Sequence, residues 1–204
     1  MNRILYTFIL LGACMIFGSC KQTTFDTKEA LWTYLKDPEN GYTHTKMIRG
    51  VRYTITYKPT DLLVDQELGG QQKEPRVIDD LRSKYTPYLY FTLSMAKNQQ
   101  ELLNTVTGDK QRFGAMVNQL AFGMEEKIHC FTPSKDTIAL ADYNYPRMYG
   151  MSGATTMLLV YPKEAAILNA EYINLTIEDL GLNTGEVRFK IPTDIIRSAP
   201  TLRF

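Results

Sequence analysis

The chain has very little histidine: only His44 and His129 occur among its 204 residues. A histidine-rich metal site is therefore excluded, and neither histidine has cysteines or carboxylates nearby at the spacing of metal ligands. We interpret both as surface or edge residues. The sequence also has no phosphate-binding Walker loop, no dinucleotide-binding glycine motif and no paired-cysteine motif. We therefore expect no bound metal and no cofactor.

The chain lacks an excess of charge of either sign, with 23 basic and 22 acidic residues. A nucleic-acid-binding domain needs a basic stripe that neutralises phosphates, so nucleic acid is not an expected partner. Electrostatic steering toward strongly charged partners is not expected either. No internal repeat or low-complexity segment is present.

A hydrophobic run long enough to cross a membrane is also missing from the start of the chain. The apolar run there covers residues 4–17, about 14 residues, whereas a transmembrane helix needs roughly 20. Arg3 precedes this run and the small residues Gly18 and Ser19 follow it, which is the three-part pattern of an export signal. The stretch Phe17-Gly18-Ser19-Cys20 resembles the lipobox of bacterial lipoproteins.

This resemblance covers residues 1–20 only and implies nothing about the fold. It implies cleavage of residues 1–19 as a signal peptide, and a membrane anchor of diacylglycerol and palmitate-type acyl chains on Cys20. Several acyl chains together give an attachment that is released slowly. Lys21 and Gln22 follow the cysteine with no aspartate, which by the same resemblance favours the outer membrane, with the domain facing the periplasm. The alternative is an ordinary secretory signal, which leaves the mature protein unanchored.

The mature chain has few cysteines left. Cys14 leaves with the signal and Cys20 takes the lipid, so Cys130 alone remains and no internal disulfide can form. Cys130 alternates with Ile128 in a strand-like stretch, which favours a buried structural thiol. His129 then points to the opposite face of that strand and is a poor base for Cys130. The remaining 185 residues, with 22 basic and 22 acidic side chains, suit one domain with a single core.

The hydrophobic pattern predicts an α+β fold. We expect a short tether over residues 20–26 and one domain over residues 27–204. Strands are predicted over residues 43–48, 51–58, 88–95, 127–131, 137–142, 155–161, 171–178 and 186–191, and helices over residues 26–36, 60–68, 75–85, 109–125 and 193–198. Most strands alternate between apolar and polar residues. Strands with one apolar face and one solvent-exposed face favour a mostly antiparallel sheet with helices packed on one face.

Signals of catalysis are weak. The stretch Gly150-Met151-Ser152-Gly153-Ala154 resembles a nucleophile elbow, but Ala154 stands where a glycine belongs and a strand follows instead of a helix. We interpret it as a turn. Acidic pairs such as Asp79-Asp80 are expected on solvated helix faces.

A connector rich in tyrosine is the candidate partner-binding segment. Tyrosine, methionine and arginine are enriched at binding hot spots, and this connector contributes the candidate residues Tyr143, Tyr145, Arg147 and Tyr149. The alternative is that these aromatic side chains fold back over the end of the sheet.

The sequence therefore leads to three hypotheses about function. The first is a non-catalytic envelope lipoprotein that binds or scaffolds a protein or glycan partner. The second is an envelope hydrolase that uses Ser152 or Cys130. The third is a small-ligand binder whose pocket is lined by Tyr88, Tyr90 and the tyrosine connector.

Overall fold

The strands on either side of Arg49-Gly50 pair as an antiparallel hairpin in the computed structural model of the chain. β2 (Thr43–Ile48) and β3 (Val51–Lys58) are joined by these two residues, whose φ angles are 48° and 78°. A type I′ turn needs positive φ at both central residues, so the predicted two-residue turn is confirmed. The structure describes residues 22–70, 74–148 and 151–204.

The hairpin belongs to a five-stranded antiparallel sheet with the order β2-β3-β4-β8-β7. β4 (Tyr88–Lys97) pairs with β3 on one side and with β8 (Thr155–Pro162) on the other, and β7 (Asp142–Asn144) forms an edge. Along β4, Leu89, Phe91, Leu93 and Met95 are all buried, as their alternation predicted. β8 lies between β4 and β7 in this sheet.

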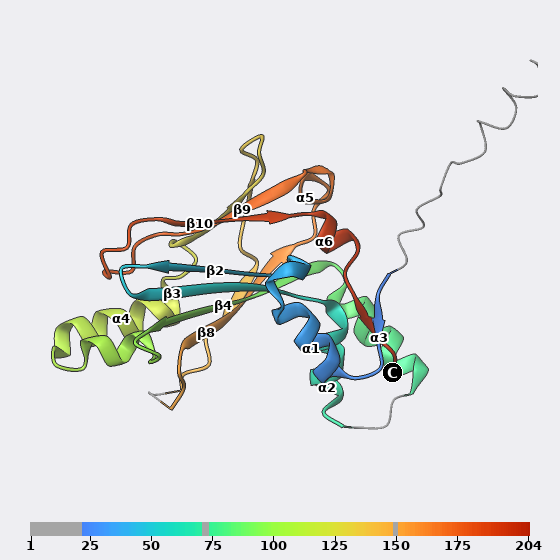
Figure 1. The fold of residues 1–204 in the computed structure, drawn as a ribbon, viewed down its shortest axis with the longest axis horizontal. Helices are drawn as coiled ribbons and strands as arrows, with labels where there is room; N and C mark the ends of the chain where they lie inside the picture. Colours follow the sequence, from blue (N-terminus) through green and yellow to red (C-terminus); the bar gives the residue numbers. More distant parts are fainter. Residues whose placement is uncertain (1–21, 71–73, 149–150) are drawn as a thin grey trace, which may run out of the picture.

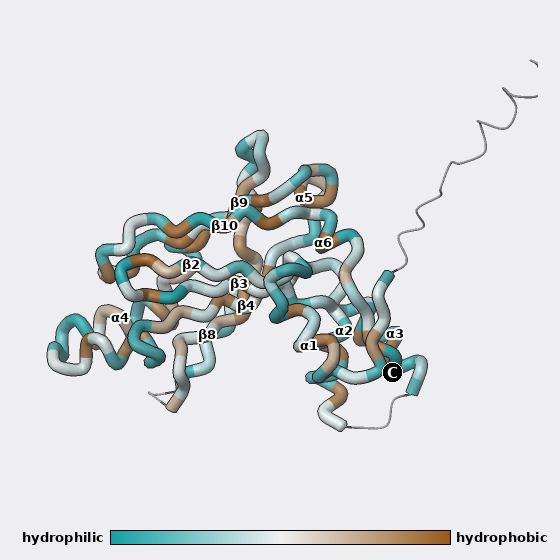
Figure 2. Tube along the Cα trace, in the orientation of Figure 1, coloured by the Kyte–Doolittle hydropathy of each residue, from teal (hydrophilic) through white to brown (hydrophobic). Residues whose placement is uncertain are grey.

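The other antiparallel strands form a second sheet of four, with the order β10-β9-β5-β6. Its strands are β5 (Ile128–Phe131), β6 (Thr137–Ile138), β9 (Tyr172–Ile177) and β10 (Val187–Pro192). Buried residues of both sheets belong to one hydrophobic cluster, so the core lies between the sheets (Figure 1). In Figure 2, hydrophilic and apolar residues alternate along β10, which has one face on this core.

The longer helices lie at the two ends of the five-stranded sheet. The first three gather at one end and α4 lies at the other (Figure 1). The helices are α1 (Lys28–Lys36), α2 (Thr60–Leu68), α3 (Pro75–Tyr85), α4 (Lys110–Phe122), α5 (Ala165–Asn169) and α6 (Asp194–Arg197), with short 3₁₀ turns at Pro38–Asn40 and Leu102–Val106. The α+β class and the mostly antiparallel pairing are thus confirmed. The division of the strands between two sheets was not predicted.

The two ends of the described chain are joined. β1 (Thr24–Phe25) pairs in parallel with β11 (Thr201–Leu202). Asp61 of α2 fastens this pair to the domain, because its carboxylate accepts the backbone N–H of Leu202 at 2.8 Å and two N–H groups of Arg82 in α3, both at 2.8 Å. The ordered fold therefore begins within the segment predicted as a tether, while residues 1–21, with the signal and Cys20, lie outside the described residues.

Two local predictions are wrong. The helix predicted over residues 26–36 begins later, because its N-cap is Thr27, whose hydroxyl accepts the N–H of Ala30 at 3.2 Å, while Asp26 pairs with Arg203 at 2.7 Å. The predicted strand over residues 137–142 is divided between β6 and β7, which belong to different sheets. The chain crosses from one sheet to the other at this point, and a hydropathy pattern along the sequence does not show such a crossing.

Candidate functional site

The five-stranded sheet carries rows of hydroxyl side chains on its outer face, the face turned away from the second sheet. Strand register places Thr45, Thr54, Ser94 and Thr156 side by side on β2, β3, β4 and β8. A second row contains Thr43, Thr56 and Thr92. On β3, β4 and β8 these residues alternate with inward-facing buried residues, so the period of two puts them on the outer face. Thr43 and Thr45 lie on the same face, because they pair with Thr56 and Thr54.

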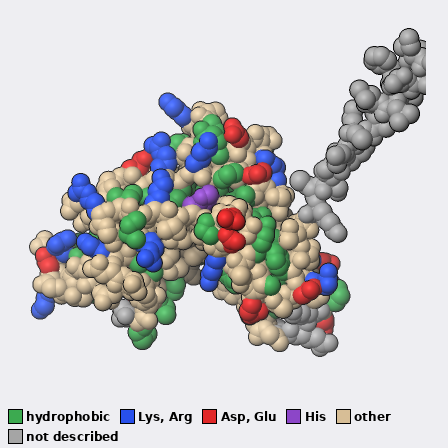
Figure 3. Space-filling view, viewed as in Figure 1, with side chains coloured by type: hydrophobic (Ala, Val, Ile, Leu, Met, Phe, Trp, Pro, Cys, Tyr) green, Lys and Arg blue, Asp and Glu red, His purple; other side chains and the backbone are tan. Residues whose placement is uncertain are grey.

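Helix α1 forms the wall of a groove over these rows. Leu31 and Leu35 are fully buried and fix the helix against the core, so the residues on its neighbouring face line the groove. The groove has a volume of about 770 Å³ and is lined by Glu29, Trp32, Thr33, Lys36, Thr43, Thr54, Thr56, Thr92, Ser94 and Thr156. We call it the hydroxyl groove. Figure 3 shows that the molecule is hollowed along its lower edge, between the part that holds α4 and β8 and the part that holds α1 and α2.

The hydroxyls at the β2 side of the groove are already engaged. Thr43 donates to the carbonyl of Leu35 at 2.7 Å, which leaves its oxygen to accept from Thr56 at 2.9 Å. Thr45 and Thr54 share a hydrogen bond of 3.0 Å. These bonds hold the edge strand β2 to α1 and β3, so this side of the groove has a fixed shape.

The hydroxyls at the centre of the groove are free. Thr92, Ser94 and Thr156 have no hydrogen-bond partner among residues 22–70, 74–148 and 151–204. All three are only partly exposed, and Ser94 lies directly opposite Thr156 in the ladder. A hydroxyl group offers one donor and two acceptor sites. The centre of the groove can therefore bind a ligand that carries both donors and acceptors.

Trp32 gives the groove its one large aromatic surface. It is the only tryptophan of the chain and is half-buried, with the ammonium of Lys36 5.7 Å from the centre of its ring. Glu29 stands on the same face of α1, and neither it nor Lys36 forms an ion pair with another described residue. The two charges have opposite signs, so the groove as a whole is close to neutral.

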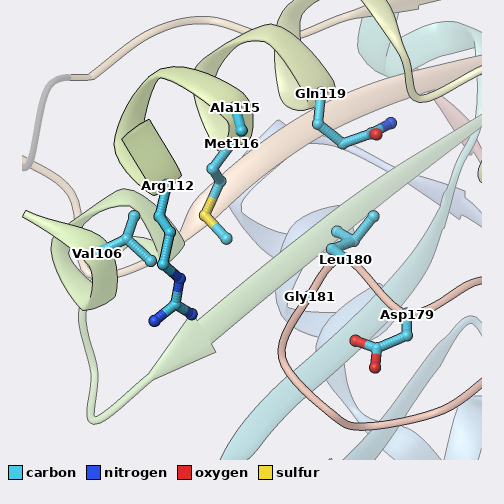
Figure 4. A pocket seen from close by; sticks show the side chains of 8 residues that line it. All are labelled: Val106, Arg112, Ala115, Met116, Gln119, Asp179, Leu180 and Gly181. Atoms are coloured by element: carbon cyan, nitrogen blue, oxygen red, sulfur yellow. The ribbon is translucent and has the colours of Figure 1, made fainter. Parts of the chain in front are cut away.

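A second cavity, of about 250 Å³, lies between α4 and the loop after β9. In Figure 4 the apolar side chains of Met116 and Leu180 lie between Arg112 and Asp179. Asp179 already accepts the backbone N–H of Leu182 at 2.8 Å. This cavity is smaller than the hydroxyl groove, and its central side chains offer no hydrogen-bonding group.

Within the described part of the tyrosine connector, the aromatic side chains and Arg147 lie in different surroundings. Tyr143 and Tyr145 are partly buried and packed against the core, and the hydroxyl of Tyr143 accepts the backbone N–H of Met124 at 3.4 Å. Arg147 is exposed and lies 5.9 Å from the ring centre of Phe122. Tyr149 lies outside the described residues. For Tyr143 and Tyr145 this arrangement agrees with the alternative in which the aromatic side chains fold back over the sheet.

The tyrosines of the predicted small-ligand pocket form an aromatic cluster. Tyr90 is buried, with its ring centre 5.9 Å from that of Tyr85 and 6.5 Å from that of Tyr88. Burial, together with the neighbouring Tyr85 and Tyr88, raises the pKa of Tyr90 to about 12. Tyr88 is exposed at the surface. Tyr90 is therefore covered by its neighbours and does not line an open pocket.

The two candidate nucleophiles lie in unreactive surroundings. Cys130 is fully buried, as predicted, and burial raises the pKa of its thiol to about 12, so the reactive thiolate is suppressed. The backbone N–H of Ser152 donates to Glu101 at 2.9 Å, and its hydroxyl accepts the N–H of Ala154 at 3.4 Å. These contacts stabilise a turn. Glu101 contacts the backbone of Ser152 and not the hydroxyl that a base would have to activate.

Over the described ranges, no group of three or more histidine, cysteine or acidic side chains is placed to hold a metal ion. Within the same ranges, no helix has the length and apolar character needed to cross a membrane.

Sequence reasoning missed the hydroxyl groove. The signal was present, because the outward residues in the middle of three successive strands are hydroxyls, with charged residues such as Arg52 and Lys58 only toward the ends of β3. We treated them only as the polar side of the sheet. That Trp32 lines the same groove depends on how α1 packs, which the sequence does not show. Comparisons with known protein families, with curated proteins and with solved structures gave no match to this chain.

Proposed function

We propose that this chain is a bacterial envelope lipoprotein whose domain is a non-catalytic binding module, with the hydroxyl groove as its ligand site. One observation supports the choice of site: the hydroxyls of Thr92, Ser94 and Thr156 have no partner in the described structure, and these residues line a groove of about 770 Å³ together with Trp32. Ligand sites of proteins commonly have volumes of about 300–1,000 Å³ and combine an aromatic surface with a few convergent polar groups.

The anchor supports a role at the membrane surface. The proposal places lipid on Cys20, and the first strand begins at Thr24. Four residues span at most about 14 Å when extended, so a lipidated Cys20 would hold the domain close to the bilayer. A ligand in the groove would then be a component of the envelope. By the lipobox resemblance, the proposed location is the outer membrane, facing the periplasm.

The surroundings of Cys130 and Ser152 support binding over hydrolysis. A nucleophile needs a positioned base and access to substrate. Cys130 has no access to solvent, and the described contacts of Ser152 include no base on its hydroxyl.

The anchor can be tested with Cys20→Ser in the full chain. Without the thiol, no lipid can be attached, and we expect the protein to move from the membrane fraction to the soluble fraction. Mass analysis of the mature wild-type protein should show acyl chains on residue 20. An unmodified Cys20 would refute the anchor and would leave the groove hypothesis standing.

The site can be tested with a photo-reactive amino acid at position 94, on the groove floor, in intact cells. The matched control is the same amino acid at position 188, which is exposed on β10 of the other sheet. We expect a discrete adduct from position 94 that position 188 does not give. The same adducts from both positions, or none from position 94, would overturn the hydroxyl groove as the ligand site.

A further inference from the structure

We propose that the ligand of the hydroxyl groove is a carbohydrate chain, with a sugar ring stacked on Trp32 and its hydroxyls bound by Thr92, Ser94 and Thr156. This inference rests on the proposed function and names the ligand class for the same site. Four properties of the groove support it.

The first property is the kind of polar group. The free groups at the centre of the groove are all hydroxyls, each of which can donate and accept. A sugar presents the same group around its whole ring, so every orientation of the ring offers matching donors and acceptors. An ionic ligand would instead need charged partners at the centre, and the charged residues Glu29 and Lys36 lie on the helix wall.

The second property is the spacing of these hydroxyls. Ser94 and Thr156 lie on neighbouring strands, which are about 4.8 Å apart. Thr92 lies two residues from Ser94 along β4, a separation of about 6.8 Å. The three residues thus outline a triangle of about the size of one sugar unit with its hydroxyl groups.

The third property is the pairing of the backbone beneath the middle of the groove. β3 and β4 are paired on both sides, whereas β8 is paired with β4 at Thr156 and with β7 only at residues 158–160. A peptide bound as an added strand needs the free N–H and C=O groups of a sheet edge. At Thr92 and Ser94 the floor therefore offers side chains only, which disfavours an extended peptide there and suits a ligand recognised through its hydroxyls.

The fourth property is the aromatic wall. Tryptophan has a wide apolar face and a polar N–H, which suits ligands with an apolar face and polar edges. A pyranose ring has this character, because its C–H bonds point to the faces and its hydroxyls to the rim. The opposite charges of Glu29 and Lys36 leave the wall without net charge, which favours uncharged sugars.

The experiment uses the full chain in a detergent without a sugar headgroup. The probes are total polysaccharide from the envelope of the producing cells, freed of protein by protease digestion, and purified chito-, manno- and malto-oligosaccharides. Trp32 is the only tryptophan, so all tryptophan emission reports on the groove. We expect a saturable change in emission with the envelope polysaccharide and with oligosaccharides of one class.

Thr92→Val and Thr156→Val remove one hydroxyl each and keep the shape of the side chain. Each should weaken binding about fivefold, the effect of losing one hydrogen bond of about 1 kcal/mol. Trp32→Ala, followed by calorimetry, should weaken it about tenfold or more. The control is Thr137→Val, an exposed threonine of the other sheet, which should bind like the wild type.

Three results would overturn the carbohydrate inference in distinguishable ways. If no polysaccharide changes the Trp32 emission while position 94 still cross-links to an envelope protein, the ligand is a protein and the proposed function stands. If neither is observed, both the carbohydrate inference and the groove as a ligand site are wrong. Binding that is equal in wild type, Thr92→Val and Thr156→Val would place the sugar elsewhere.

Discussion

The two faces of the five-stranded sheet are made from the same strands and have opposite characters. On the inner face, β3, β4 and β8 present residues such as Ile55, Phe91 and Leu159, all fully buried against the second sheet. On the outer face the same strands present threonine and serine in the hydroxyl groove, all partly exposed except the buried Thr56. The inner face therefore stabilises the fold, while the residues of the outer face are not needed for the core and can contact a ligand.

The outer face itself changes character along its length. At the end near α2, Lys58 is buried and donates to Gln66 at 2.8 Å, and burial lowers the pKa of its ammonium. In the middle, under α1, the same face is open and lined by hydroxyls. Which part of the outer face a ligand can reach thus depends on where the helices cover the sheet, and not on the sequence of the strands alone.

The largest effect is expected from Phe91→Ala on the inner face. Phe91 is fully buried, with its ring centre 5.5 Å from that of Tyr57 and 6.3 Å from that of Tyr161. Removing a buried phenylalanine leaves a cavity and costs about 3–5 kcal/mol of unfolding free energy. Denaturant unfolding measures the change. A loss below about 1 kcal/mol would contradict the assignment of the core to this face.

A smaller loss is expected from Asp61→Ala, which breaks the connection between α2, α3 and β11. The side chain of Asp61 is 4% exposed and that of Arg82 is 38% exposed, so solvent reaches the guanidinium and partly screens the attraction between the two charges. We expect a loss of about 2–3 kcal/mol, below the usual cost of breaking a fully buried pair. The control is Glu67→Ala, which removes the exposed pair with Lys84 and should leave the unfolding midpoint unchanged.

Much of this comparison between faces could be predicted from the sequence. Leu89, Phe91, Leu93 and Met95 alternate with polar residues, and a strand has a period of two, so their common burial follows directly. The turn at Arg49-Gly50 was predictable because only two residues separate the two strands and the second is a glycine, which adopts positive φ readily. The positive φ of Arg49 is uncommon for a residue with a side chain and was not predictable.

The site could be predicted only in part. The alternation along the strand places Thr92 and Ser94 on a solvent-exposed face. The groove exists, however, because Leu31 and Leu35 hold α1 against the core next to that face. That contact joins residues far apart in the chain, and hydropathy patterns carry no information about it. The tyrosine connector was a reasonable candidate by composition, yet Tyr143 alternates with outward residues of β7 and so faces the core.

A pH-dependent effect is expected from His44, at the edge of the inner face. Its Nε2 is buried without a hydrogen-bond partner in the described part of the chain, and burial lowers its pKa from the usual 6.5, against a smaller opposite effect of the Gly41 backbone. Below about pH 6.5 the unfolded chain therefore binds the proton more readily than the folded protein. Unfolding free energy should fall as the pH drops through this range, and His44→Gln should reduce that fall.

The matched control for His44 is the other histidine. His129 is 40% exposed at its side chain and lies 2.9 Å from Glu178 on the surface. His129→Gln should leave the loss of stability that is due to His44 in place. Denaturant unfolding of the three proteins between about pH 5 and 8 measures the difference. An unchanged pH dependence in His44→Gln would show that His44 is protonated equally easily in both states.

The smallest effect on stability is expected from Thr92→Val, one residue from Phe91 and on the opposite face. The hydroxyl of Thr92 has no partner within the described ranges, so its removal breaks no bond, and the added methyl group stays partly exposed. The unfolding free energy should change by less than about 0.5 kcal/mol, as for other surface substitutions. If binding is lost in this variant while the unfolding midpoint stays fixed, the hydroxyl acts on a ligand. If the midpoint falls with the binding, the hydroxyl supports the fold, and the separation between a stabilising face and a binding face fails at this strand.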